Sequence, residues 1–197
     1  MLFRDFIRHL DDGQPPPIVR VGLLIELVNT RHLGVGEVER RWFDGPSNCL
    51  PGTFIWWAPE RTSPYEEGFN NATIFLDRKI ERDVPMRRIV TAKELMHVFD
   101  TAERQVGNPD AFVSLTGDIE AEPLPGDASA MYLADEAAVW MAILALIPPP
   151  LRAAAHGAWA DKTVTTAELA WRWRVPEIVA ARAMGSYYET AQHRFLG

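Results

Sequence analysis

The sequence predicts an α+β fold in which a small sheet is followed by a helical half of the chain. Between residues 38 and 78, short segments rich in aromatic and β-branched residues are bounded by Gly, Pro and Asn, a pattern typical of strands. After Pro85 the apolar residues recur at helical spacing instead. Because the two periodicities occupy separate stretches, we expect the strands to come before the helical half in the sequence and the helices to pack against the sheet.

The elements of the first half are expected as short units. An amphipathic helix and a second, more apolar helix precede the sheet, and breakers separate them. The strands then follow one another without intervening helices. The predicted units are the helices Leu2–Leu10 and Val19–Asn29 and the strands Glu39–Phe43, Thr53–Trp57 and Ala72–Asp77.

The elements of the second half are expected to be helices around one long loop. Asp83 and Pro85 are suitable residues for a helix start, and three consecutive prolines end a strongly apolar helix at Ile147. The loop Gly107–Ala130 is rich in Gly, Pro, Asp and Ser, and loops of this length are usually functional or mobile. The predicted helices are Pro85–Glu103, Met131–Ile147, Thr166–Arg174 and Pro176–Phe195.

Composition excludes several classes of protein. A chain of 197 residues with 47% hydrophobic residues is long enough for a real core, and Cys49 alone cannot build a disulfide framework or a four-cysteine zinc site. The net charge of −7 argues against nucleic-acid or anionic-membrane partners. The longest apolar run, Ala137–Ile147, is too short to span a bilayer. We therefore expect a soluble, cytoplasmic protein, without membrane or direct nucleic-acid binding.

The window Ile89–Asp100, IVTAKELMHVFD, carries the residues of greatest chemical interest. Lys93, Glu94 and His97 stand where the zinc-peptidase pattern H-E-x-x-H has its first histidine, its glutamate and its second histidine. Residues four apart share a helix face, so two histidines in this pattern can hold one zinc ion while the glutamate activates water. Here the first ligand is a lysine, whose ammonium group is a poor ligand at neutral pH.

Three further segments extend this pattern. The helix Leu133–Pro148, LADEAAVWMAILALIP, opens with an acidic pair and ends in proline; Arg87–Ala92 precedes the degenerate motif, and Thr166–Met184 reads as a helix pair. In this order the chain resembles the ImmA/IrrE family of zinc metallopeptidase-like proteins, with Thr73–Asp77 similar to the edge strand beside that family's cleft. The resemblance covers roughly residues 72–184.

The resemblance implies a fold and a role for each matching residue. It implies a zincin-like domain over residues 1–150, with a small twisted sheet and two central helices, and a C-terminal helical subdomain over residues 151–197. His97 would be the second zinc histidine, Glu94 the general base, and Glu136 or its neighbour Asp135 the third ligand, while Lys93 replaces the first histidine.

Loss of one ligand predicts a degenerate, non-catalytic protein that holds no cofactor. Such a pseudoenzyme would act as a regulatory or protein-binding module, and the family's roles suggest a polypeptide partner that is a transcriptional repressor.

An alternative hypothesis keeps a metal and an enzymatic activity. Glu94, His97 and Asp100 occur at i, i+3 and i+6, which would line them along one side of a helix. With Asp135 or Glu136 they could bind zinc or another divalent metal in a rebuilt, active metal-dependent endopeptidase. The opposing interpretation is that Lys93 forms a salt bridge with one of these carboxylates and fills the metal position with its ammonium group.

Two other features favour packing over binding. Thr166–Met184 has the appearance of a helix–turn–helix with nearby arginines, but Trp171 and Trp173 and the interleaved glutamates favour packing over DNA recognition. The aromatic residues of the predicted strands are likewise expected to lie mainly in the core. These are Trp42, Phe54, Trp56 and Trp57.

Overall fold

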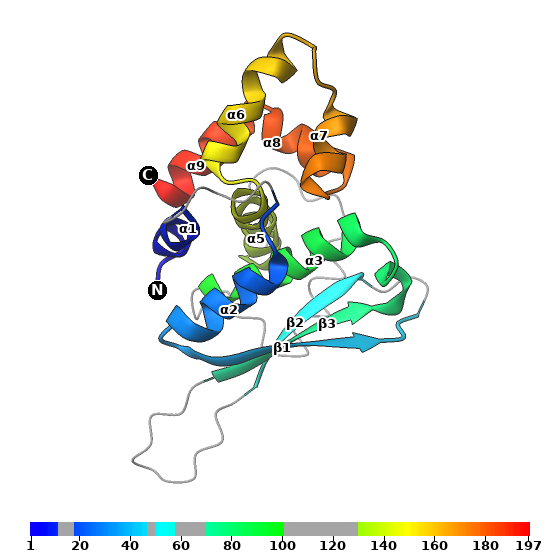
Figure 1. Ribbon diagram of the computed structural model, residues 1–197. Helices are drawn as coiled ribbons and strands as arrows, with labels where there is room; N and C mark the ends of the chain where they lie inside the picture. Colours follow the sequence, from blue (N-terminus) through cyan, green and yellow to red (C-terminus); the bar gives the residue numbers. More distant parts are fainter. Residues whose placement is uncertain (12–17, 47–49, 58–69, 101–129) are drawn as a thin grey trace.

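A mixed sheet of three strands lies along one side of a layer of helices (Figure 1). The computed structural model describes residues 1–11, 18–46, 50–57, 70–100 and 130–197. The strands are β1 (Val35–Phe43), β2 (Gly52–Trp57) and β3 (Asn70–Asp77), in the order β1-β3-β2. β3 pairs in parallel with β1 and antiparallel with β2. The architecture is therefore α+β, as the sequence predicts.

The expected position of β3 at the sheet edge is wrong. Within the described sheet β3 is the central strand, and its residues are mostly buried on both faces, including Thr73, Ile74 and Asp77. A nearly continuous apolar run is typical of a strand covered on both sides. The two edges of the described sheet are formed instead by β1 and β2.

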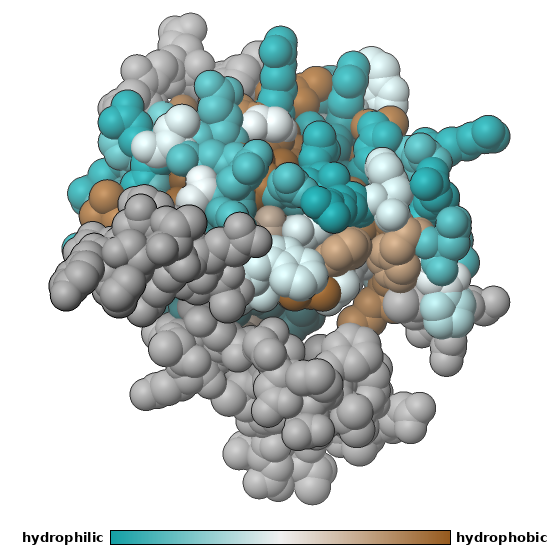
Figure 2. All heavy atoms as spheres, turned by 90° about the horizontal axis from the view of Figure 1, so that it is seen from below, coloured by the Kyte–Doolittle hydropathy of each residue, from teal (hydrophilic) through white to brown (hydrophobic). Residues whose placement is uncertain are grey.

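The outer face of the sheet carries part of the aromatic residues. Ile55 and Trp57 are exposed there, and Figure 2, which views the molecule from that side, shows apolar and intermediate side chains among hydrophilic ones. Trp57 donates from Nε1 to Oγ1 of Thr73 at 2.9 Å. Phe54 is buried, so the expectation of core packing holds for Phe54 and does not hold for Trp57.

Two of the predicted helices are shorter or divided in the structure. The predicted helix Pro85–Glu103 is α3 up to Met96 and then a 3-10 turn, His97–Phe99. Pro176–Phe195 is two helices separated at Gly185. The observed helices are α1 (Phe3–Asp11), α2 (Val21–Arg31), α3 (Val84–Met96), α5 (Ala130–Leu146), α6 (Pro149–Ala160), α7 (Thr166–Trp173), α8 (Glu177–Met184) and α9 (Tyr187–Leu196).

The helix α6 is absent from the predicted elements, because three consecutive prolines by themselves predict only the end of the preceding helix. Pro149 and Pro150 occupy the first turn of α6, where the missing N–H groups would have no helical partner in any case. The same residues therefore end α5 and begin α6. The predicted boundary between residues 150 and 151 falls inside this helix.

The core lies around α5, whose residues from Met141 to its end at Leu146 are all buried. Figure 1 shows α5 between α3 on the sheet side and the C-terminal helices. A helix enclosed in this way needs apolar residues on every face, as its sequence has. The N-terminal helix α1 also meets α9, with the rings of Phe3 and Phe195 6.3 Å apart.

Among the described residues no single helix has the length and apolarity of a membrane span, although Leu133–Leu146 and Pro149–Ala160, bent by 80°, reach that measure as a pair. Cys49 and the predicted loop Gly107–Ala130, apart from its last residue, lie outside the described residues.

Candidate functional site

The candidate site is built on the C-terminal end of α3, where Lys93 and Glu94 lie. The helix begins because the side chain of Asp83 accepts a hydrogen bond from the backbone N–H of Met86, and Pro85 fits its first turn. Its inner face, which includes Leu95 and Met96, is buried in the core. This packing fixes the direction in which the polar side chains leave the helix.

Lys93 makes the central contacts of the site. Its Nζ lies 3.0 Å from Oε1 of Glu94 and also contacts Oδ1 of Asp135, which α5 supplies. Burial of the ammonium group acts to lower the pKa of Lys93, but the charges of Glu94 and Asp135 and hydrogen bonds to both outweigh it. The pKa of Lys93 therefore lies above its ordinary value, and the group is a cation at neutral pH.

His97 lies beside this ion pair and is fixed by a different carboxylate. Its Nδ1 is 2.7 Å from Oδ2 of Asp100, a hydrogen-bonding distance. Its Nε2 faces Glu94 and Asp135 at 3.8 Å from Oε2 and 3.9 Å from Oδ1, which is too long for hydrogen bonds. The ring of Phe54, on β2, lies beside the imidazole, with the two ring centres 6.0 Å apart.

The strand β2 approaches α3 so closely that only glycine fits at its first residue. A Cβ on Gly52 would clash with Cγ1 of Val90 and lie 3.2 Å from Cγ of Glu94. Glu94 itself is only 3% exposed. The close approach therefore covers the carboxylate from the sheet side, and a glycine at a strand end is a signal that sequence reasoning could have used.

The structure brings most of the predicted residues together and leaves one apart. Glu94, His97 and Asp135 face one another around Lys93, whereas the Glu136 side chain is 42% exposed and lies 3.9 Å from Nη1 of Arg182. Of the two residues expected at the position of the third ligand, Glu136 and Asp135, it is thus Asp135 that lies beside Lys93.

Asp100 does not join the others through the expected i, i+6 helical spacing. The α-helix ends at Met96, and Asp100 follows the 3-10 turn with an extended backbone. Its carboxylate contacts Nδ1 of His97, the ring nitrogen that faces away from Glu94. The position suits the orientation of an imidazole better than the sharing of a metal ion with it.

The side chains present do not fit a zinc ion. The ammonium of Lys93 lies where a dication would need to approach Glu94 and Asp135, and like charges repel. Within the described ranges no group of three or more His, Cys, Asp or Glu side chains is arranged to hold a metal ion. Instead, the ammonium group of Lys93 forms ion pairs with the buried carboxylate of Glu94 and with the carboxylate of Asp135.

Comparisons of the chain with known protein families, with curated proteins and with solved structures find no match. The resemblance to the ImmA/IrrE family therefore rests on the motifs quoted above.

Proposed function

We propose that this protein is a degenerate, non-catalytic relative of the ImmA/IrrE zinc metallopeptidases, with a zincin-like fold. In this proposal it acts in the cytoplasm as a regulatory, protein-binding module, and its partner is a transcriptional repressor. The observation that carries the proposal is the contact of the Lys93 ammonium with both Glu94 and Asp135.

The charge of Lys93 supports a structural rather than catalytic use of the acidic residues. A zinc site of this type needs acidic and imidazole ligands free to donate to the metal, and a glutamate free to accept a proton from water. Here Oε1 of Glu94 accepts a hydrogen bond from Lys93 at 3.0 Å. The lysine thus supplies the positive charge that a zinc ion would otherwise supply.

The metal content of purified variants tests this proposal. We expect no stoichiometric metal in the wild type, and roughly one zinc per chain in Lys93→His, because the substitution removes the repelling charge and adds an imidazole. Lys93→Met is the matched control, since it removes the charge without adding a ligand. Inductively coupled plasma mass spectrometry after zinc incubation and desalting measures all three.

Stoichiometric metal in the wild type would contradict the proposal and favour the rebuilt Glu94, His97 and Asp135 site of a metal-dependent peptidase. Cleavage of a repressor by the wild type with zinc, abolished in Glu94→Ala, would contradict it independently.

A further inference from the structure

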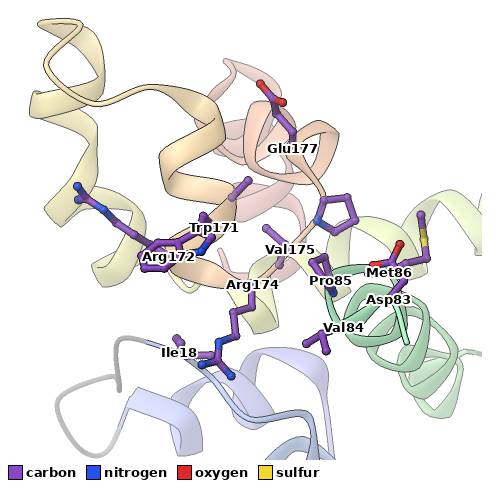
Figure 3. A pocket seen from close by; sticks show the side chains of 12 residues that line it. Ile18, Asp83, Val84, Pro85, Met86, Trp171, Arg172, Arg174, Val175 and Glu177 are labelled. Carbon is purple, nitrogen blue, oxygen red and sulfur yellow. Dashed lines mark hydrogen bonds between the residues drawn. The ribbon is translucent and has the colours of Figure 1, made fainter. Parts of the chain in front are cut away.

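An apolar groove of about 670 Å³ lies between the start of α3 and the turn that joins α7 to α8 (Figure 3). It is separate from the residues around Lys93. Its apolar lining comes from three parts of the chain that are distant in sequence, so only the fold creates it. The apolar side chains include Ile18, Val84, Met86, Trp171, Val175 and Pro176.

Trp171 is the most exposed apolar residue that lines the groove. Its side chain is 81% exposed, although an indole is among the side chains that gain most from burial. A second groove of about 400 Å³, on the side of α6, shares Ile18, Trp171 and Arg172 with the first. The indole therefore stands between two apolar hollows, and a ligand that covered it would reach both.

The segments that line the groove are joined to one another by hydrogen bonds from the side chain of Arg88. Its guanidinium donates to the carbonyl oxygens of Arg174 at 2.9 Å, Val19 at 2.8 Å and Trp173 at 3.4 Å. These bonds join α3, the segment before α2 and the end of α7. A surface that is already ordered loses little entropy when a ligand binds.

The charges at the rim indicate the sign of the ligand. Arg172 and Arg174 form no ion pair with a described residue, and in Figure 3 both extend on the side of Ile18 and Trp171. Glu168, one turn before Arg172, accepts hydrogen bonds from the backbone N–H and the hydroxyl of Thr165 at 2.7 and 2.9 Å. These bonds, and to a smaller extent the nearby charge of Arg172, lower the pKa of Glu168, but the two side chains form no ion pair. Two guanidinium groups that the described carboxylates leave without an ion pair, beside an exposed indole, favour carboxylates next to apolar side chains.

Two acidic residues also line the groove, and their positions do not cancel these charges. Asp83 accepts a hydrogen bond from the backbone N–H of Met86 and so caps α3. Glu177 lies in the first turn of α8, away from Arg172 and Arg174 in Figure 3. The rim therefore has a cationic and an anionic side.

We propose that this surface binds a polypeptide segment in which acidic residues flank a large apolar side chain. The apolar side chain covers Trp171 and enters the groove, and the carboxylates pair with Arg172 and Arg174. This inference does not depend on the proposed function, because the groove shares no residue with the site at Lys93. The apolar lining favours a peptide over nucleic acid, whose phosphate backbone would need a broad cationic surface.

Panning a phage-displayed library of random peptides on the full-length wild type tests the proposal. We expect the enriched peptides to combine Asp or Glu with Trp, Phe or Leu. Fluorescence anisotropy of a labelled, enriched peptide then measures affinity for variants of the groove. Trp171→Ser should weaken binding by roughly tenfold or more, as for an aromatic residue at an interface centre.

The charge variants are chosen to preserve the fold. Arg172→Gln keeps a good helix former in α7, and Arg174→Asn suits the left-handed backbone at that residue, where φ is 54°. Each should weaken peptide binding several-fold. Tyr187→Ser, at a residue 74% exposed outside the groove, and Arg40→Gln on β1 are the controls and should bind as the wild type does.

Three outcomes would overturn the proposal. One is the absence of acidic–apolar peptides among those enriched on the wild type, and another is binding that Trp171→Ser leaves unchanged while circular dichroism shows a folded protein. The third is binding of a labelled DNA duplex, in place of peptides, that depends on Arg172 and Arg174.

Discussion

At the scale of single residues, the surroundings of Lys93 decide how the site is interpreted. Its side chain is 19% exposed and that of Glu94 is 5% exposed, so both charges are largely removed from water. A buried charge is tolerated only when a partner compensates it. Lys93 and Glu94 therefore depend on each other, and Asp135 adds a third charge at the exposed end.

Replacing Lys93 with methionine should destabilise the protein, because Glu94 would stay buried without its cation. We expect a loss of about 2–4 kcal/mol in the free energy of unfolding, measured by urea denaturation. The double variant Lys93→Met with Glu94→Gln should recover part of that loss. Arg41→Met breaks an exposed pair with Glu39 and should cost less than about 1 kcal/mol.

The same pair predicts a pH dependence with a definite sign. Because the pKa of Lys93 is raised in the folded state, its stabilisation is fully present below the ordinary value of 10.5 and is lost as pH rises through the higher folded value. The stability difference between the wild type and Lys93→Met should thus be constant near neutral pH and shrink in strongly alkaline buffer. A difference that was already lost as pH rises from 7 to 9 would be inconsistent with the ion pair as its source.

At the scale of elements, the contact between β2 and α3 depends on Gly52. The strand passes so close to the helix that a methyl group would clash with Val90 and press on Glu94. Interiors are packed densely enough for one extra methyl group to force a shift. The position of the edge strand, and with it Phe54 beside His97, therefore depends on a residue without a side chain.

Gly52→Ala should lower the free energy of unfolding by about 1–3 kcal/mol through overpacking. Gly22→Ala is the matched control, because a Cβ at that residue of α2 meets nothing within 4 Å. It should raise stability by about 0.5 kcal/mol, since alanine favours a helix over glycine. Thermal denaturation of both variants measures the contrast, and equal effects would show that crowding at β2 is not the cause.

At the scale of the whole molecule, the C-terminal helices and the sheet half are joined by more than apolar contact. The buried cluster runs from Phe3 in α1 to Ala191 in α9. Arg88 adds hydrogen bonds across 69 and 86 residues of sequence, to Val19 and Arg174. Burial, and the nearby charge of Arg174, lower the pKa of Arg88, yet an arginine remains charged at neutral pH.

Arg88→Met should therefore weaken the association between α3 and the end of α7. We expect a loss of about 2–3 kcal/mol, because three carbonyl groups lose a charged donor together. Arg87→Met, at a neighbouring half-buried residue whose Nη1 bonds, among the described residues, only to the carbonyl of Glu81, should cost less than about 1 kcal/mol. Urea denaturation followed by tryptophan fluorescence compares them, and similar losses would contradict a bridging role for Arg88.

Local sequence patterns determined much of this protein. The strand and helix periodicities predict an α+β fold, and the apolar run of α5 predicts its burial. The four-residue spacing predicts that Lys93 and His97 lie on one side, and they do so although α3 ends at Met96. The positions of proline and glycine were less informative about where elements begin, end and pack. The prolines at 148–150 end one helix and also begin the next, and both roles use the same missing N–H groups.

The tertiary structure alone decided which partners meet. Asp135 and Glu136 are adjacent in sequence but about 100° apart around their helix, so the rotation of α5 against α3 selects Asp135 for Lys93 and directs Glu136 to Arg182. The edge position of β2 and the bonds of Arg88 likewise join residues distant along the chain. Periodicity fixes which face of an element is apolar, whereas side-chain packing between elements fixes which charges come into contact.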